Sequence, residues 1–306
     1  MRFTVLWATM AMVLAACEAT PPTAAPEVPA KRMTWGDLMS RELPQPTSTH
    51  AYGNDPAQVA DLWLPDGAGP HPTVLMVHGG CWQKAIADRT LMNYAAEDLR
   101  QRGMAVWNIE YRGVDETGGG YPGTYLDVSR AAENLLEKGP ELGLDVGQIV
   151  AVGHSAGGHL AAWLATQDNL PLDSAVNTGH SVPLAAVVIS GGLVDLEASA
   201  PVTLGSCLSS IMDNLTGEPS ETRPNVFVDT SPAELLPAAS LFISVNGDSD
   251  GIAPSVLGQG LTKTVQAAGG DARFVEVQNS GHVELIAPGT EAFNIQADLL
   301  WLHLGQ

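Results

Sequence analysis

Short apolar runs recur along the chain, and most are followed closely by Gly, Pro or Asn. The run 59–64 alternates apolar and polar positions, whereas 73–78 is continuously apolar. Alternation is typical of a half-buried strand, and a continuous run is typical of a strand covered on both faces. The segments that we expect to be strands are 59–64, 73–78, 105–111, 148–153, 185–190, 241–245 and 273–277.

Longer segments between these runs carry apolar residues three or four positions apart, which is the helical period. The expected helices are 91–101, 124–138, 156–166, 253–268 and 291–304. Strands that alternate with helices predict an α/β fold, with a mostly parallel central sheet and helices on both faces. Residues 193–238 interrupt the alternation, and we expect them to form a short lid insertion above the sheet.

The first 16 residues form a separate hydrophobic feature. Arg2 precedes an apolar run that is too short to span a bilayer, and the run ends in Leu-Ala-Ala before Cys17. This pattern resembles a bacterial lipoprotein signal, which implies that 1–16 is removed and that Cys17 is lipidated. The alternative is an ordinary secretory signal that happens to contain a Cys.

Residues 17–33 are rich in Pro and Ala and have almost nothing that could pack, so we expect a semi-rigid tether. Residues 34–306 would then be one catalytic domain, since α/β domains often reach this size. The lipid on Cys17 would hold that domain in the bacterial cell envelope, on the exported side. Glu18, which follows Cys17, does not indicate whether the anchor lies in the inner or the outer membrane.

The charge balance excludes some partners. Lys and Arg number 14 against 34 Asp and Glu, a formal net charge of −20. Nucleic-acid binding and electrostatic docking on anionic lipid both need a basic surface, so we expect neither. Membrane contact would come only through the lipid anchor. An anionic substrate would gain little from electrostatic steering, which favours small neutral substrates.

The pentapeptide Gly153-His154-Ser155-Ala156-Gly157 fits the pattern G-x-S-x-G and lies between an apolar strand and an apolar helix. This is the context of a nucleophile elbow, a tight turn that exposes a serine hydroxyl. The helix N-terminus behind the serine favours developing negative charge. We therefore expect Ser155 to be the nucleophile; the alternative is a simple helix N-cap.

A serine nucleophile needs a base, and the base needs an acid that orients it. His282 follows the last expected strand on a loop and is the best candidate for the base. Asp250 follows the preceding strand and is our choice for the acid, with Asp248 second and Asp195 third. The calcium-loop and zinc spacings fail, so we expect no metal and no cofactor.

The oxyanion that forms during acyl transfer also needs donors. Gly79 and Gly80 follow the strand 73–78, and we expect the backbone N–H groups of Gly80, Cys81 and Ala156 to form the oxyanion hole. Trp82 is expected either to line the substrate pocket or to belong to the core.

Taken together, the chain resembles the α/β-hydrolase superfamily, specifically the esterase and lipase group with an HGGxW oxyanion motif, which includes carboxylesterases and kynurenine formamidase. The resemblance spans about residues 58–304. It implies an α/β-hydrolase fold and a serine esterase that acts through an acyl-enzyme. The alternatives are an arylformamidase and, from another class, a non-catalytic binding module. The resemblance to this group rests on the motifs 78–82, 111–113, 153–158, 247–250 with Pro254, and 281–282.

Cys81 and Cys207 are the only other thiols of the mature chain. The expected compartment is oxidising, and Cys207 lies in the expected lid insertion. We therefore hypothesise a Cys81–Cys207 disulfide that joins the lid to the oxyanion loop; the alternative is two separate buried thiols.

Overall fold

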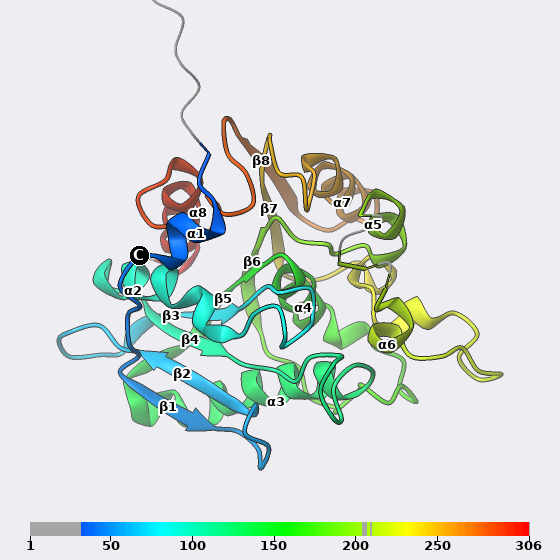
Figure 1. Ribbon diagram of the computed structural model, residues 1–306. Coiled ribbons are helices and arrows are strands. Elements are labelled where there is room, and N and C mark those ends of the chain that lie inside the picture. Colours follow the sequence, from blue (N-terminus) through cyan, green and yellow to red (C-terminus); the bar gives the residue numbers. More distant parts are fainter. Residues whose placement is uncertain (1–31, 204–206, 209, 306) are drawn as a thin grey trace, which may run out of the picture. The chain divides into compact units, whose positions relative to one another are not determined.

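The computed structural model describes residues 32–203, 207–208 and 210–305 (Figure 1). The expected signal 1–16, the lipidation site Cys17 and nearly all of the tether lie outside the described residues. Residues 31–306 group into one compact unit. Arg32 and Met33 already contact it: Arg32 Nη1 donates to the Ser249 carbonyl at 3.2 Å, and the Met33 N–H donates to Glu284.

An eight-stranded sheet forms the centre of this unit, in the order β1-β2-β4-β3-β5-β6-β7-β8. The β1–β2 and β2–β4 pairs are antiparallel, and all other neighbours are parallel. This confirms the mostly parallel sheet. The strands are β1 (Ser48–Ala51), β2 (Val59–Trp63), β3 (His71–Val77), β4 (Ala105–Ile109), β5 (Leu144–His154), β6 (Leu184–Ser190), β7 (Leu241–Gly247) and β8 (Ala272–Val277).

Helices connect the strands, and several of the connections are short 3-10 turns. The α-helices are α1 (Trp35–Met39), α2 (Asn93–Gln101), α3 (Gly123–Lys138), α4 (Ala156–Leu164), α5 (Leu196–Val202), α6 (Met212–Thr216), α7 (Ser255–Ala267) and α8 (Glu291–His303). The 3-10 turns are η1 (Arg89–Met92), η2 (Pro140–Leu142), η3 (Gln167–Asn169), η4 (Val226–Asp229) and η5 (Pro232–Leu235). Among the described residues, no helix is long and apolar enough to cross a membrane.

Two hydrophobic clusters cover the two faces of the sheet, which explains the continuous apolar runs. In β3, Val74 belongs to the cluster with α2 and α8, whereas its neighbour Leu75 belongs to the cluster with α3, α4 and α7. Successive side chains of a strand point to opposite faces. Both faces are therefore buried, and helices lie on both, as the sequence predicts (Figure 1).

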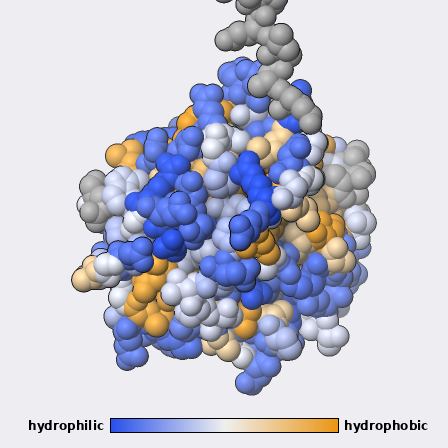
Figure 2. Space-filling model, turned by 60° about the vertical axis from the view of Figure 1, so that its left-hand side comes forward, coloured by the Kyte–Doolittle hydropathy of each residue, from blue (hydrophilic) through white to orange (hydrophobic). Residues whose placement is uncertain are grey.

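The segment between β6 and β7 contains α5, α6, η4 and η5. It covers the range 193–238, where the strand–helix alternation is interrupted. The short helix α1 and the edge strand β1 are two elements that the hydrophobic pattern does not predict. In Figure 2 hydrophilic residues cover most of the visible face, and the hydrophobic ones form scattered patches.

Candidate active site

Ser155 sits between the last residue of β5 and the first residue of α4. Its backbone has φ 55° and ψ −120°, a conformation that L-residues rarely adopt. The Ser155 N–H donates to the Ser190 carbonyl at 2.9 Å, which anchors the turn to β6. The strained turn places Ser155 in the wall of a pocket, as a nucleophile elbow requires.

The two glycines of the elbow are needed for close backbone approach. A Cβ at Gly153 would lie 2.0 Å from the Gly157 carbonyl oxygen, and a Cβ at Gly157 would lie 2.2 Å from the Val77 carbonyl oxygen. A larger side chain at either position would push α4 away from β3 and β5. The G-x-S-x-G pattern is therefore a packing requirement of this turn.

His282 and Asp250 meet at the same end of the sheet, on the loops that follow β8 and β7. His282 Nδ1 lies 2.6 Å from Asp250 Oδ2, and both side chains are buried. The other oxygen, Asp250 Oδ1, accepts from the N–H groups of Ile252 and Ala253 at 2.8 and 2.9 Å. Asp250 is thus held as an acceptor on both oxygens, and it fixes the Nδ1–H tautomer of His282.

The two other candidate acids have different roles. Asp248 is exposed and accepts from the Ser280 N–H at 3.2 Å. Asp195 is the N-cap of α5 and accepts from the Ala198 N–H at 2.9 Å. The structure therefore pairs His282 with Asp250, the first choice from the sequence.

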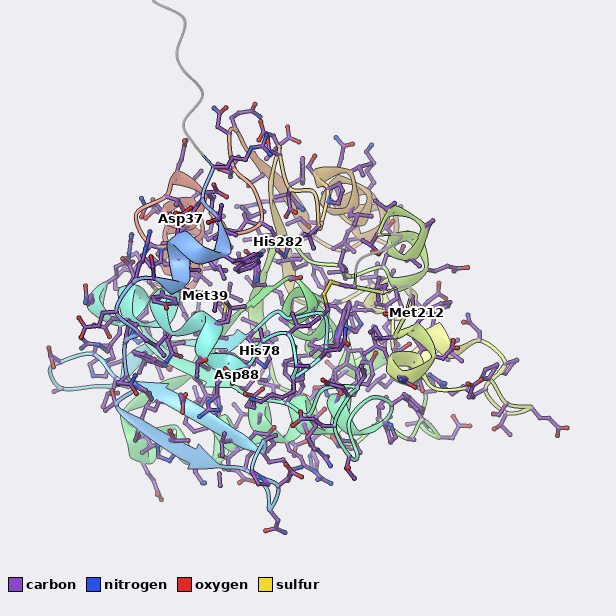
Figure 3. All side chains as sticks on the ribbon, in the orientation of Figure 1. Asp37, Met39, His78, Asp88, Met212 and His282 are labelled. Carbon is purple, nitrogen blue, oxygen red and sulfur yellow. A yellow bond between two sulfur atoms is a disulfide. The ribbon has the colours of Figure 1, made fainter. Side chains whose placement is uncertain are left out.

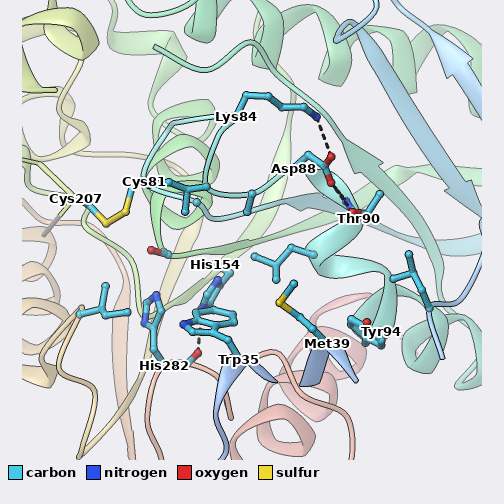
Figure 4. A pocket seen from close by; sticks show the side chains of 17 residues that line it. Trp35, Met39, Cys81, Lys84, Asp88, Thr90, Tyr94, His154, Cys207 and His282 are labelled. Atoms are coloured by element: carbon cyan, nitrogen blue, oxygen red, sulfur yellow. Dashed lines mark hydrogen bonds and ion pairs between the residues drawn. A yellow bond between two sulfur atoms is a disulfide. The ribbon is translucent and has the colours of Figure 1, made fainter. Parts of the chain in front are cut away.

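A pocket of about 610 Å³ brings Ser155 and His282 together with residues of the oxyanion loop (Figure 4). His282, Met39 and Asp88, which Figure 3 labels, all line this pocket. No group of three or more His, Cys, Asp or Glu that could hold a metal ion occurs among residues 32–203, 207–208 and 210–305.

His154 holds the backbone of the expected base, His282, in place. It is fully buried, and its Nε2 donates to the His282 carbonyl at 3.1 Å, with the two rings 4.3 Å apart. Burial and, to a lesser degree, the neighbouring His282 lower the pKa of His154 well below its usual value. His154 is therefore neutral, and it holds the backbone of the base without competing for protons.

The oxyanion loop follows β3 in an unusual backbone conformation. Gly80 has φ 118° and Cys81 has φ 54°. Within the described part of the chain, the N–H groups of Gly80, Cys81 and Ala156 donate to no other group. Gly80 and Cys81 line the pocket beside Ser155. Gly80 and Cys81 can therefore donate to a substrate oxygen, and Ala156 follows Ser155 directly at the start of α4 but is not itself part of the pocket wall.

His78 holds this loop through both of its ring nitrogens. Nδ1 lies 2.6 Å from the Gly79 carbonyl oxygen, and Nε2 lies 2.8 Å from Glu110 Oε1. These two contacts, on opposite sides of the ring, fix its orientation. Because the Gly79 carbonyl and the Gly80 N–H belong to one trans peptide, this bond directs the Gly80 N–H the opposite way.

Glu110 is the buried counter-ion of this arrangement. Burial alone would raise its pKa, but the charge and hydrogen bond of His78 and the nearby Lys84 ammonium outweigh it and lower the pKa to about 2. Lys84 Nζ lies 3.0 Å from Glu110 Oε2. The sequence analysis did not single out Glu110 or Lys84, because Glu110 follows β4 whereas its partners His78 and Lys84 lie after β3, far away in the sequence.

Replacing Glu110 by Gln should destabilise the protein by about 3–5 kcal/mol, since it removes the buried carboxylate that holds His78 and Lys84. The free energy of unfolding in urea measures this effect. Glu97→Gln is the matched control: it breaks a surface pair with Arg100 and should cost less than about 1 kcal/mol.

The contact between Glu110 and His78 also predicts how the stability of the protein depends on pH in acid. The pKa of Glu110 is lower in the folded protein than in the unfolded chain, so the stabilisation is present above about pH 4.5 and is lost as the pH falls toward 2. Glu110→Gln should show a shallower loss over this window. Equal acid sensitivity of the two proteins would contradict the ion pair.

Trp82 does not line the pocket, so its expected substrate contact is wrong. The side chain is fully buried, and its Nε1 donates to His159 Nδ1 at 3.2 Å. Trp82 has a backbone φ of 55° and is part of the turn whose residues Gly80 and Cys81 face the pocket. The ring therefore packs in the core on the other side, beneath α4.

Cys81 and Cys207 form a disulfide with a Cα–Cα distance of 4.9 Å, which confirms the hypothesis from the sequence. Both residues line the pocket. The bond ties an expected oxyanion residue to the segment between β6 and β7, across 126 residues of sequence. Figure 4 shows it at the opposite end of the pocket from Tyr94.

The helix α1 supplies pocket residues that the sequence analysis missed. Trp35, Met39 and the following Leu43 line the pocket, and the Trp35 ring lies edge-on to His282 with centroids 6.2 Å apart. A sequence signal does exist. Thr34 and Asp37 form a capping box, in which Thr34 Oγ1 accepts from the Asp37 N–H and the Asp37 carboxylate accepts from the Thr34 N–H.

The parallel sheet, the elbow after β5 and the loops after β7 and β8 define an α/β-hydrolase fold. The model of the BD-FAE family matches residues 60–265. The chain therefore belongs to the BD-FAE family.

Known proteins resemble this chain at moderate identity. Esterase LipC of Mycobacterium tuberculosis is 27% identical over 239 residues, which cover 76% of this chain and 58% of LipC. This chain thus spans less than two thirds of that relative. Kynurenine formamidase of Danio rerio is 23% identical over 278 residues, covering 89% and 86% of the two chains. The crystal structure of esterase B from Lactobacillus rhamnosis has a TM-score of 0.69 at 21% identity, covering 85% and 86%, which supports the fold.

Proposed function

We propose that this protein is a serine hydrolase of carboxylic esters with small neutral substrates. Ser155 Oγ attacks the ester carbonyl while His282 Nε2 accepts its proton, and the oxyanion is held by the N–H groups of Gly80, Cys81 and Ala156. Collapse of this intermediate expels the alcohol, which takes the proton from His282. Water then cleaves the acyl-Ser155 ester by the same steps in reverse order.

The observation that carries this proposal is the buried His282–Asp250 pair at 2.6 Å, which shares one pocket with a serine on a strained elbow. The family and the esterase relatives point in the same direction. No cofactor enters the proposed steps, because the side chains and backbone N–H groups account for each proton and charge.

A fluorophosphonate probe tests the nucleophile directly. We expect covalent labelling of the wild type and no labelling of Ser155→Ala. A wild type that stays unlabelled would reject the hydrolase and favour a non-catalytic binding module. Equal labelling of the variant would place the nucleophile elsewhere.

Amide hydrolysis of a formamide is the second candidate, because the kynurenine formamidase relative matches 89% of this chain. Acyl transfer to Ser155 uses the same groups for an ester and for an amide. Side-by-side assays with p-nitrophenyl esters and N-formylkynurenine decide between them. Activity on the formamide alone would replace the ester proposal.

We also propose that the protein is a lipoprotein of the cell envelope, anchored through Cys17. The support is the sequence pattern of residues 1–17 alone. Incorporation of labelled palmitate into the wild type, and none into Cys17→Ser, is the expected result. A wild type that is cleaved but takes up no palmitate would reject the lipid anchor and indicate an ordinary secretory signal.

A further inference from the structure

The pocket extends well beyond the groups that perform the proposed chemistry. One end contains Cys207 (Figure 4). The other end, which we call the apolar arm, lies between α1 and the chain from η1 to α2, and Figure 4 shows Met39 and Tyr94 on the side away from Cys207. The apolar arm consists of Met39, Leu43, Ile86, Leu91 and Tyr94, and Trp35 lies between it and His282.

Exposed hydrophobic side chains concentrate at this arm. Eight large hydrophobic residues are exposed in the described part of the chain, and three of them line the pocket: Met39 at 64%, Leu43 at 42% and Ile86 at 58%. Grouped apolar exposure beside a binding pocket marks a surface that an apolar ligand covers.

The charged groups along the edge of the arm are already paired. Lys84 Nζ contacts both Asp88 Oδ2 and Glu110 Oε2 at 3.0 Å, and Asp88 Oδ1 accepts from the Thr90 N–H at 2.9 Å. A sugar or peptide in the arm would need free donors and acceptors. These side chains would have to break existing bonds to supply them, at a cost in free energy.

The wall formed by α1 is fastened to the loop of the expected base. Glu284 is buried; its Oε1 accepts from the Met33 N–H at 2.5 Å, and its Oε2 accepts from the Gly281 N–H at 3.0 Å. Arg41 Nη1 donates to the Pro288 carbonyl at 2.9 Å. The arm is therefore a fixed part of the site, although α1 has only five residues.

We propose that the apolar arm binds an elongated apolar chain of the substrate and that Met39 and Leu43 determine this specificity. This inference rests on the proposed ester hydrolysis and names its substrate class: esters whose acyl or alcohol part is a chain of several carbons. Each methylene that leaves water on binding adds about 0.8 kcal/mol, or about fourfold in affinity.

Two series of esters test the arm. In the first, p-nitrophenyl acetate, butyrate, hexanoate and octanoate vary the acyl chain; in the second, ethyl, butyl and hexyl acetate vary the alcohol. We expect kcat/KM to rise in one series, by up to about fourfold per methylene until the arm is filled. The series that rises identifies which part of the ester occupies the arm.

The double variant Met39→Ser/Leu43→Ser tests the residues. Both side chains are largely exposed, so the fold should persist. We expect kcat/KM for the longest ester of the rising series to fall by about tenfold and that for the shortest ester of the same series to fall far less, so that the dependence on chain length is lost. Leu172→Ser is the matched control, since Leu172 is 98% exposed and lies outside the pocket.

The outcomes separate the two proposals. Flat or falling values in both series, or an equal loss in Leu172→Ser, would overturn the apolar arm while ester hydrolysis stands. Absence of hydrolysis of every ester, together with no fluorophosphonate labelling, would reject the proposed function itself.

Discussion

Asp250→Asn is expected to lower kcat for p-nitrophenyl butyrate by about 10⁴-fold. The Asn side-chain oxygen can still accept from the N–H groups of Ile252 and Ala253. Its amide nitrogen would then face His282 Nδ1 and donate to it. This fixes the tautomer with the proton on Nε2, so His282 cannot accept the proton of Ser155.

Asp248→Asn is the matched control for this variant. Asp248 is exposed, and its contact with the Ser280 N–H survives in Asn, so kcat should change little. Circular dichroism of both variants should match the wild type. If Asp248→Asn causes the larger loss of kcat, the acid is Asp248, and the pairing of Asp250 with His282 is structural.

Cys207→Ala is expected to lower both activity and stability. Without the disulfide, Cys81 is released from the segment between β6 and β7, and its N–H is held less firmly toward the oxyanion. We expect kcat to fall by about 10–100-fold, less than the ~10²–10³-fold that complete loss of one donor costs. Loss of a cross-link across so long a loop should cost about 2–5 kcal/mol.

Reduction of the wild type should reproduce both effects. Dithiothreitol is expected to lower kcat and the melting temperature of the wild type, and to leave Cys207→Ala unchanged. The variant thus controls for effects of the reductant itself. A reduced wild type with full kcat and an unchanged melting temperature would show that the oxyanion loop keeps its conformation without the bond.

Much of this architecture can be predicted from local patterns. The inner strands of the parallel sheet are buried on both faces, so each appears as an apolar run, and the expected range 185–190 differs from β6 by one residue. The elbow is equally local, because the turn around Ser155 needs glycines on both sides within five residues. The base and acid follow from the order of loops at one end of that sheet.

Other parts depend on contacts between distant segments. The short α1 is held by Glu284, far along the chain, and β1 lies at the sheet edge with alternate residues only partly buried. Neither leaves a strong hydrophobic period. The orientation of Trp82 depends on the positive φ at its own position, which the side-chain sequence does not reveal. The sequence therefore predicts the catalytic residues better than it predicts the residues that form the walls of the pocket.

The contacts that complete the pocket have a kinetic consequence for the newly made chain. The Met33–Glu284 bond joins residues 251 positions apart, and the disulfide joins residues 126 apart. Closing such loops is slow, and contacts of this kind form late in folding. A polypeptide still being synthesised contains Ser155 long before it contains His282. Hydrolytic capacity would therefore arise only when synthesis is nearly finished, and a chain cut short before residue 282 would hold a nucleophile without a base.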